Sequence, residues 1–402
     1  MDILGLLKEL FSGVLYLFTA EGLKTLVMFV ISGVLIYLAI KKDYEPALLL
    51  PIGFGAILAN LPPVIDQVTG SATASVLGSE GFLTVLFNAG IKNELFPVLI
   101  FIAVGAMIDF SPLLKDPSMI FFGAAAQFGI FATFLLSLVL IPIVLPQTAG
   151  NDSLILRLAS AIGIIGAADG PTSILVSQVL HSSYVGPIAV AAYSYMALVP
   201  IIQPFAIKLV TTKKERRIRM PYNPKNVSRT LRICFPILVT IIAGFIAPMS
   251  VSLVGFLMFG NLLRECGCLD RLSETAQNTL ANLITLLLGI TISFSMRAEQ
   301  FVNRNTLIIM GLGLVAFVFD SIAGVMFAKL LNLFSKTKIN PMVGAAGISA
   351  FPMSARVIQK MGIEADSQNH LLMHAVGANV AGQIASVLAG GMILNLVPQL
   401  LK

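Results

Sequence analysis

An aspartate lies inside one of the most apolar stretches of this chain. Residues 166–174 read GAADGPTSI, with small residues before Asp169 and Pro171 two positions after it. A charged side chain at the middle of a membrane costs at least about 2.5–3.5 kcal/mol on insertion scales, and such residues are usually functional. Glycine and proline interrupt a helix and free backbone carbonyls. A carboxylate, carbonyls and hydroxyls form an oxygen cage for a small hard cation. The alternative is a packing break that holds a protonated or ion-paired acid.

A second stretch, KINPMVGAAGISAFPMSAR, offers neutral oxygens and one positive charge. It contains Asn340, Gly344 and Ser349, and it ends at Arg356. The amide and hydroxyl oxygens are predicted to complete, from another part of the chain, the cation site that Asp169 begins. A guanidinium group repels a cation but binds carboxylates through two parallel hydrogen bonds. Arg356 is therefore predicted to bind an anionic group.

Three more polar side chains lie in apolar segments. Tyr195 lies in AAYSYMALVP and Asn379 in HAVGANVAGQ, each in the segment that follows one of the two stretches. Both are predicted to reach the same site, or else to form an ordinary hydrogen bond between helices. Asp320, in VAFVFDSIAG, lacks the glycine and proline pattern. We interpret it as a helix-packing residue or a proton site.

The composition indicates the kind of element that must position these residues. Of the 402 residues, 57% are hydrophobic and 11% charged, and the mean hydropathy is +0.91. A soluble domain carries about 25% charged residues, so the chain is predicted to be a polytopic membrane protein. Its apolar runs are continuous and reach roughly 17–25 residues, which favours membrane-spanning helices over a β-barrel. No G-x-x-x-x-G-K-[S/T] loop is present, which excludes ATP hydrolysis by that route, and no nucleic-acid partner is predicted.

The apolar segments form two sets separated by a basic stretch. Residues 208–232 carry nine basic residues and one acid, a density typical of a cytoplasmic loop. The predicted segments lie near 24–40, 46–61, 94–110, 118–145, 154–181 and 185–206, and then near 231–249, 250–263, 276–296, 305–334, 341–361 and 367–397. The predicted domains are an interfacial amphipathic helix at 1–20, a first membrane repeat at 21–207, a basic linker at 208–230 and a second repeat at 231–402.

The two sets resemble each other in sequence. Gly163, Gly166, Pro171 and Ser173 coincide with Gly344, Gly347, Pro352 and Ser354 at a single offset, and Asp169 aligns with Ala350. If the basic loop is inside and the fifth segment of each set does not cross fully, each set crosses the membrane five times. An odd number of crossings inverts the second set. We predict an all-α polytopic membrane protein with two inverted repeats of about five transmembrane helices, and with broken or re-entrant helices at the centre, as in elevator transporters.

GAADGPTSI and NPMVGAAGISAFPMSARV together resemble the β subunit of the biotin-dependent, sodium-pumping decarboxylases, over nearly the whole chain. That family comprises the oxaloacetate, methylmalonyl-CoA and glutaconyl-CoA decarboxylase complexes. The resemblance implies that the subunit decarboxylates carboxybiotin on a separate carrier and exports Na⁺, with uptake of a proton. The motif GANVAG around Asn379 is similar to the family's GPNVAG, with Ala378 where proline is common.

The resemblance also implies roles for individual residues. The expected Na⁺ ligands are Asp169, Asn340, Gly344, Ser349 and Asn379, and the expected catalytic residues are Asp169, Tyr195, Ser349 and Arg356, the last of which would also bind carboxybiotin. Because the chain has no AMKM biotinylation motif, the biotin must arrive on a partner. The expected partners are biotin-carrier and carboxyltransferase subunits and a small membrane-anchoring subunit, in a bacterial plasma (inner) membrane. A homo-oligomer within the complex is a further option.

Two other functions stay open from the residues alone. A secondary Na⁺/organic-anion transporter of elevator type would share the inverted repeats, the broken helices and the buried acid. A passive channel is disfavoured, because the sequence contains no ring of repeated acids and no carbonyl filter motif.

Overall fold

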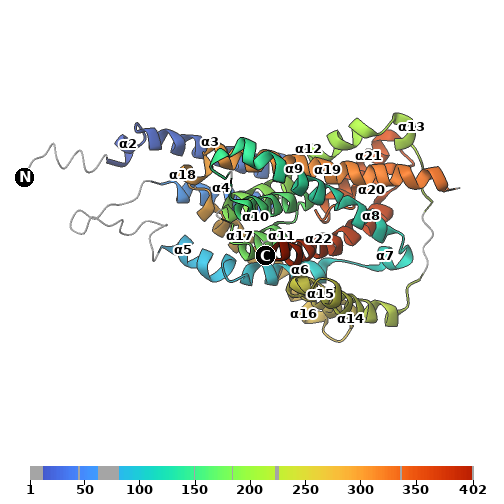
Figure 1. Ribbon diagram of the computed structural model, residues 1–402. Coiled ribbons are helices and arrows are strands. Elements are labelled where there is room, and N and C mark those ends of the chain that lie inside the picture. The colour runs from blue at the N-terminus through green and yellow to red at the C-terminus, as the bar shows by residue number, and fades with distance from the viewer. Residues whose placement is uncertain are drawn as a thin grey trace, which may run out of the picture. The chain divides into compact units, whose positions relative to one another are not determined.

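The computed structural model describes residues 12–43, 46–61, 81–148, 150–182, 184–221, 226–335 and 337–400 (Figure 1). Within these ranges every regular element is a helix or a helical turn. The chain divides into two compact units. Unit 1 comprises Met1–Phe96 and Asn282–Ile308, and unit 2 comprises Pro97–Ala281 and Ile309–Lys402. All residues predicted to form the site belong to unit 2.

Unit 1 is built around a long apolar helix. Thr19 begins this helix by accepting a hydrogen bond from the N–H of Gly22 at 3.0 Å, and Lys41 and Lys42 end it, which suits the negative end of a helix dipole. The elements are α2 (Ser12–Tyr16), α3 (Ala20–Lys42), α4 (Pro46–Ala59), α5 (Phe82–Leu86), the turn η1 (Phe87–Ile91), α17 (Ala281–Ile292), η6 (Ser293–Ser295) and α18 (Ala298–Phe301). Of the predicted surface helix at 1–20, residues 1–11 lie outside the described residues.

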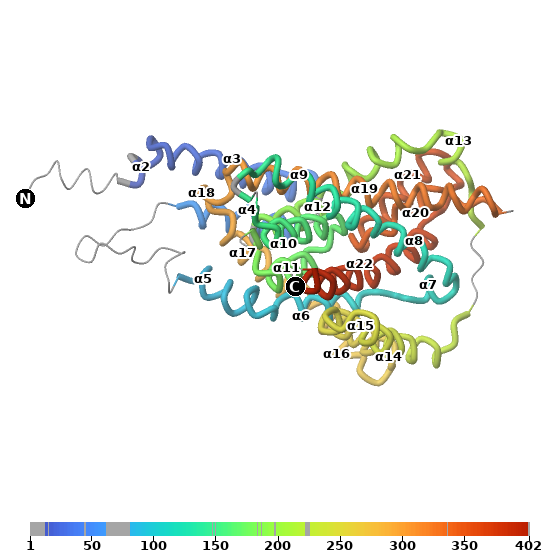
Figure 2. The backbone as a smooth tube through the Cα atoms, in the orientation of Figure 1, coloured from blue at the N-terminus to red at the C-terminus, as the bar shows by residue number. Residues whose placement is uncertain are grey.

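Unit 2 holds the remaining elements, of which α6 and α19 begin in unit 1. They are α6 (Leu95–Met107), α7 (Ser111–Lys115), α8 (Met119–Ala126), α9 (Phe128–Val144), η2 (Pro146–Thr148), α10 (Asp152–Gly163), η3 (Ile164–Ala167), α11 (Gly170–Val179), α12 (Val185–Val210), α13 (Lys213–Arg216), α14 (Arg229–Ile246), η4 (Pro248–Ser250), α15 (Val251–Glu265), α16 (Asp270–Thr275), η5 (Ala276–Leu280), α19 (Arg304–Phe334), α20 (Pro341–Ala345), α21 (Met353–Ala365) and α22 (Leu372–Leu400). In Figure 2, α8 and α9 follow one another as a single interrupted helix.

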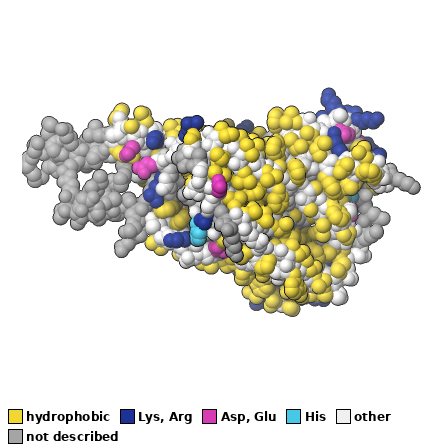
Figure 3. Space-filling model, viewed as in Figure 1, with side chains coloured by type: hydrophobic (Ala, Val, Ile, Leu, Met, Phe, Trp, Pro, Cys, Tyr) yellow, Lys and Arg dark blue, Asp and Glu magenta, His cyan; other side chains and the backbone are white. Residues whose placement is uncertain are grey.

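The length and surface of these helices fit a membrane. Among the described residues, six helices are long and apolar enough to span a bilayer, or up to eight if each of two bent pairs is one span. Large apolar side chains such as Phe245 and Phe334 are 85% and 83% exposed. Figure 3 shows hydrophobic side chains over much of the visible surface. The protein is therefore a multi-pass membrane protein.

The fifth segment of each predicted set is interrupted, as the sequence predicts. In the first, α10 passes into the 3₁₀ turn η3, and Ala168 has a left-handed φ of 50° before α11 begins. In the second, residues 346–352 separate α20 from α21. We call residues 164–169 the first break and residues 346–352 the second break. The helical turns α5 and η1, by contrast, lie in a region where no apolar segment was predicted.

Candidate functional site

Asp169 begins the second half of a broken helix. It is the N-cap of α11, and its Oδ1 accepts a hydrogen bond from the N–H of Thr172 at 3.3 Å. Its Oδ2 accepts from the Thr172 hydroxyl at 2.7 Å and from the Ser386 hydroxyl at 3.0 Å. The carboxyl group is only 6% exposed. Local capping therefore fixes the orientation of the acid, and a side chain from another helix completes its surroundings.

The two breaks touch each other directly. The carbonyl oxygen of Ala167 accepts hydrogen bonds from the Ser349 hydroxyl at 2.7 Å and from the Ser349 N–H at 3.2 Å. Ser349 is 2% exposed. The two stretches that the sequence analysis singled out, 182 residues apart at this contact, thus meet two residues before Asp169.

One face of α22 binds both breaks. Asn379 donates from Nδ2 to the carbonyl of Ile348 at 2.6 Å, and Gln383 donates to the carbonyl of Ser349. Ser386 binds Asp169. The i, i+4, i+7 spacing of these three α22 residues places them on the same side of the helix. α22 therefore holds the second break through two amides and the first through one hydroxyl.

The chemistry of this junction suits a small hard cation. The Asp169 carboxylate supplies a charge, and the Ser349 and Ser386 hydroxyls supply neutral oxygens. The Oδ1 of Asn379 is buried and has no hydrogen-bond partner among the described residues. A buried acceptor without a donor is costly unless a ligand uses it. Oxygen donors of this kind, next to unwound backbone, are the groups that bind Na⁺ in broken-helix transporters.

Tyr195 lies on α12 and binds elsewhere. Its hydroxyl donates to the carbonyl of Met310 on α19 at 2.5 Å. Tyr193, two residues earlier, instead lies against Gly170, which directly follows the first break, because a Cβ placed on Gly170 would strike the Tyr193 ring. The Tyr193 hydroxyl is buried and has no hydrogen-bond partner in the described part of the chain. Of this pair of tyrosines, Tyr193 is the one beside Asp169.

Asn340 and Gly344 lie at the other end of the second broken helix. Asn340 caps α20 by accepting from the N–H of Met342, and its Nδ2 donates to the carbonyls of Arg216 at 3.0 Å and Ile218 at 2.8 Å. Gly344 faces α19, where an added Cβ would clash with the carbonyl of Gly324. The structure therefore ties Asn340 to the basic linker and uses Gly344 as a close helix contact. A ligand role for either stays a prediction.

Arg356 lies on α21, one turn after the second break. Its side chain is exposed, and its guanidinium forms no hydrogen bond or ion pair with the described residues. The guanidinium is therefore accessible, and its binding of an anion stays a prediction. No role in binding Na⁺ follows from its position.

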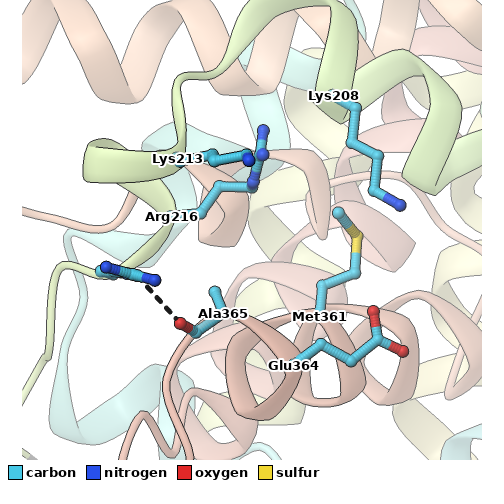
Figure 4. A pocket seen from close by; sticks show the side chains of 7 residues that line it. Lys208, Lys213, Arg216, Met361, Glu364 and Ala365 are labelled. Atoms are coloured by element: carbon cyan, nitrogen blue, oxygen red, sulfur yellow. Dashed lines mark hydrogen bonds between the residues drawn. The ribbon is translucent and has the colours of Figure 1, made fainter.

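A basic cavity opens farther along the same helix. It has a volume of about 250 Å³ and is lined by Lys208, Lys213, Arg216, Arg217, Met361, Glu364 and Ala365. Figure 4 shows Lys208 reaching from α12 toward Met361 and Glu364 of α21, with Lys213 and Arg216 on the facing side. Arg217 donates to the carbonyl of Ala365 at 3.1 Å. Four cations and one acid make this cavity attractive to anions.

Sequence reasoning missed Thr172, Ser386, Gln383 and Tyr193. Two signals pointed to some of them. Thr172 occupies the third helical position after a capping aspartate, where its N–H and hydroxyl both face the cap. Ser386 and Gln383 share the helix face of Asn379, so the period of 3.6 residues predicts them as neighbours of that residue. No local pattern distinguishes Tyr193 from Tyr195.

Comparison with known proteins identifies the family of the chain. The sequence profile of the family described as the Na⁺-transporting oxaloacetate decarboxylase beta subunit matches residues 24–397. The chain belongs to this family. It is 46% identical to the methylmalonyl-CoA decarboxylase subunit beta of Propionigenium modestum, over 94% of this chain and 96% of the relative. It is 44% identical to the oxaloacetate decarboxylase beta chain of Klebsiella pneumoniae, over 92% and 94%.

A third relative carries a different substrate in its name. The chain is 46% identical to the glutaconyl-CoA decarboxylase subunit beta of Acidaminococcus fermentans, over 92% of each protein. Near-equal similarity to β subunits of three decarboxylases means that the family relationship does not distinguish their substrates. Membership of a Na⁺-transporting decarboxylase family supports the decarboxylase pump over the secondary transporter.

Proposed function

We propose that this chain is the membrane subunit of a sodium-pumping decarboxylase. It couples the decarboxylation of carboxybiotin, carried by a partner subunit, to Na⁺ export and proton uptake. The observation that carries the proposal is the contact between the two breaks, Ala167 with Ser349, beside the buried carboxylate of Asp169. An acid at a junction of two interrupted helices provides a cation site that changes whenever the breaks move apart.

In this proposal Na⁺ binds between the two breaks. Asp169 supplies the negative charge, and Ser349 and Asn379 supply neutral oxygens from the second break and α22. Rotation of the Ser349 hydroxyl away from the Ala167 carbonyl frees both oxygens for the ion. Asn340 and Gly344 enter the coordination only if α20 releases the linker carbonyls and moves along α19.

Arg356 and Tyr195 serve the chemistry in this proposal. Carboxybiotin, when bound, supplies the carboxyl group that leaves as CO₂. The exposed guanidinium of Arg356 holds that carboxylate through paired hydrogen bonds. Tyr195 acts through α12 by fixing that helix to α19, next to the tyrosine that contacts Gly170.

The contacts of the repeated glycines support a two-fold relation between the repeats, which the proposed inverted repeat requires. Gly163 packs on α9, where an added Cβ would lie 2.8 Å from the carbonyl oxygen of Ile130. Its counterpart Gly344 packs on α19 against the carbonyl of Gly324. Each glycine thus touches a helix of its own half, and the two contacted residues, Ile130 and Gly324, are 194 residues apart.

The second glycine of each pair touches the opposite half. Gly166 packs against Ala316 of α19, and Gly347 packs against Phe122 of α8. These contacted residues, Phe122 and Ala316, are again 194 residues apart. If the two halves are exchanged, the contact of each glycine becomes the contact of its counterpart in the other half. A two-fold relation between the repeats requires this correspondence.

The basic linker, which is predicted to be cytoplasmic, contacts α19 and residues 366–369 at one end of unit 2. Lys329 forms an ion pair with Glu215 at 2.9 Å, and Arg219 pairs with Asp366 at 2.7 Å. Asn369 donates to the carbonyl of Arg216 at 3.0 Å. Figure 1 shows α7, α13, α20 and α21 at this end. This arrangement supports a linker at 208–230 on one side of the membrane, and we propose that this side is the cytoplasm of a bacterial cell.

The partners follow from what the chain lacks. We propose that a biotin carrier and a carboxyltransferase deliver the carboxyl group, and that a small membrane subunit anchors them. The basic cavity is lined by residues of the same helix as Arg356, α21, and we propose that it contacts an acidic surface of the carrier. The carboxyltransferase, and not this chain, would choose the acyl substrate.

The proposal is tested by isolating the tagged chain from its own cells. We expect a biotinylated protein to copurify, and we expect the isolated complex to decarboxylate its acid only in the presence of Na⁺. Asp169→Asn keeps the capping oxygen but removes the charge, and it should abolish activity by at least about 100-fold while the complex still assembles. Copurification of no biotinylated protein, with Na⁺-driven uptake of an organic anion by the chain alone, would establish the transporter instead.

A further inference from the structure

A second acid lies inside unit 2, and the proposed sodium site does not use it. Asp320 is near the middle of α19, and it is the only charged residue between Arg304 and Lys329. Its side chain is 1% exposed. An ionisable group at this depth is a functional candidate unless its neighbours fully explain it.

One oxygen of Asp320 has a structural role. Oδ1 accepts a hydrogen bond from the N–H of Ile130 at 2.9 Å. This N–H is a first-turn donor of α9, which starts after the interruption at Gln127. The contact is close, because an added Cβ on Gly129 would lie 2.8 Å from the carboxyl carbon of Asp320. Oδ1 therefore caps α9 from a neighbouring helix.

The other oxygen has no such explanation. Oδ2 is buried and has no hydrogen-bond partner among the described residues. It faces the first break, since a Cβ placed on Gly166 would lie 2.8 Å from Oδ2 and 2.8 Å from the Cβ of Ala316. Oδ2 therefore lies against the backbone of the first break at Gly166.

The cap alone does not require an acid. Asparagine offers the same acceptor to the N–H of Ile130 and carries no charge. An ionised oxygen without a donor is much more costly in an apolar interior than a neutral carboxyl group. The residues shown at the Asp320 carboxyl belong to α9 and η3, and neither element contains a titratable residue. α20, which packs on α19 one turn farther along at Gly324, contains none either, and the nearest acid along the first break is Asp169.

We infer that Asp320 is a proton-binding site of the pump, separate from the sodium site. The inference rests on the proposed function. A proton needs only the one free oxygen, whereas Na⁺ needs several oxygens around it. Asp169, with three hydrogen-bond donors, is prepared to hold a charge. In Asp320, Oδ1 caps α9 and Oδ2 is available to bind a proton, which makes the carboxyl group neutral.

The first break links the two acids. Gly166 contacts Asp320, and Asp169 follows three residues later in the same turn. A movement of this turn that admits Na⁺ at Asp169 also changes the surroundings of Oδ2. The proton that adds to Oδ2 in one position is released in the other, and the total charge of the pair of acids and their cations stays constant. Asp320 in this scheme stores a proton and does not contact carboxybiotin.

The central test compares Asp320→Asn with Ser321→Ala. Asparagine preserves the cap but cannot bind an exchangeable proton, and Ser321 is a buried neighbour on the same helix whose hydroxyl has no described partner. In proteoliposomes containing the complex, we expect Asp320→Asn to lower proton uptake and Na⁺ transport at least about tenfold and to remove their pH dependence. Equilibrium Na⁺ binding to the purified variant should be unchanged, and Ser321→Ala should behave as the wild type.

Two results would overturn the inference. One is that Asp320→Asn transports with wild-type rate and pH dependence while Asp320→Ala is destabilised. Asp320 would then serve only as a helix cap. Loss of Na⁺ binding in Asp320→Asn would make it a sodium ligand.

Infrared spectroscopy can test whether Asp320 carries a proton even in a protein that is not turning over. Infrared spectra of the wild type and of Asp169→Asn should both contain a carboxylic-acid C=O band from a buried group, and Asp320→Asn should lack it. Absence of that band from wild type and Asp169→Asn at every pH would exclude a proton on Asp320. Failure of the proposed function would leave this band in place, so the two failures are distinguishable.

Discussion

At the scale of single residues, Tyr193 and Tyr195 of α12 make different contacts. Tyr193 lies against Gly170, directly after the first break, without a described hydrogen-bond partner, whereas Tyr195 binds the carbonyl of Met310. Tyr193→Phe should change the Na⁺ concentration needed for half-maximal activity, with little effect on stability. Tyr195→Phe should cost about 1 kcal/mol, because a buried carbonyl loses its donor. It should lower the maximal rate and leave the sodium dependence unchanged.

Sodium titrations and thermal unfolding of both variants check this prediction. Phenylalanine retains the ring in each case, so the comparison isolates the hydroxyl group. The opposite assignment, with a sodium effect only in Tyr195→Phe, would return Tyr195 to the ion site.

The residues of the candidate site differ in how far sequence could predict them. The intramembrane charge of Asp169 was recognisable because charge and helix breakers coincide there. The contact of Ser349 with Ala167 was not, because a bond across 182 residues depends on how the helices pack. Asp320 illustrates the same limit, since its apolar sequence context does not indicate that it caps α9.

At the scale of elements, α20 and α19 cross with their backbones in contact. A Cβ on Gly344 would clash with the Gly324 carbonyl, and a Cβ on Gly324 with that of Gly344. Gly344→Ala should therefore destabilise the protein by about 1–3 kcal/mol and lower activity. Gly311, on the same α19, has nothing within 4 Å of an added Cβ.

Gly311→Ala is the matched control for the helix crossing. It should leave activity intact and stabilise the helix by up to about 1 kcal/mol. Thermal unfolding in detergent and Na⁺-dependent decarboxylation measure both variants. Equal behaviour of the two variants would contradict the close crossing.

The stability of the linker end of unit 2 depends on pH through one exposed ion pair, Arg219 with Asp366. The hydrogen bond from Arg219, followed by that from the N–H of Gln368, lowers the pKa of Asp366 below its ordinary value. An acid with a lowered pKa stabilises the fold above its unfolded pKa, near 3.9, and this contribution disappears as the pH falls through the lowered folded value. We expect Arg219→Ala to loosen residues 212–221 at neutral pH and to have no effect in acid.

Amide hydrogen exchange of residues 212–221 at several pH values measures this difference. Lys214→Ala is the control, because the Lys214 side chain is exposed and forms no hydrogen bond or ion pair with the described residues. High salt should reduce the effect of Arg219→Ala by screening. A difference between wild type and variant that grows in acid would have the wrong sign.

Element positions were the more predictable part of the fold. Long apolar runs identified α3, α14, α19 and α22, because the bilayer sets their length. The α5–η1 region was missed, since no long apolar run marks it. The bend of 71° within α12 lies between Met196 and Leu198. It is explained by Pro200, which has no N–H to donate to the carbonyl of Met196. The sequence contains this proline, but it does not give the angle.

At the scale of the whole molecule, inverted repeats place the linker and the C-terminus on opposite sides of the membrane. Cysteines at Lys214 and at Lys402, in a background without Cys234, Cys266 and Cys268, test this arrangement. Lys214 is exposed, whereas Thr211 is buried and binds the carbonyl of Ile207. Lys402 lies outside the described residues. Membrane-impermeant label should reach Lys214 only from the cytoplasm and Lys402 only from outside, and labelling of both from one side is incompatible with the inverted repeat.

The anchoring of residues 212–221 has a consequence for how the protein can be made. These residues leave the first half of the chain, yet they are held to the second half by Asn340, Asn369, Asp366 and Lys329. A covalent connection after Pro221 is therefore not what keeps the halves together. Two polypeptides, 1–221 and 222–402, expressed in one cell should assemble into an active pump. Asn340→Ala combined with Arg219→Ala should abolish that assembly, while the unbroken chain with the same substitutions should still fold. The C-terminal residues of the first fragment would then be what binds it to the second.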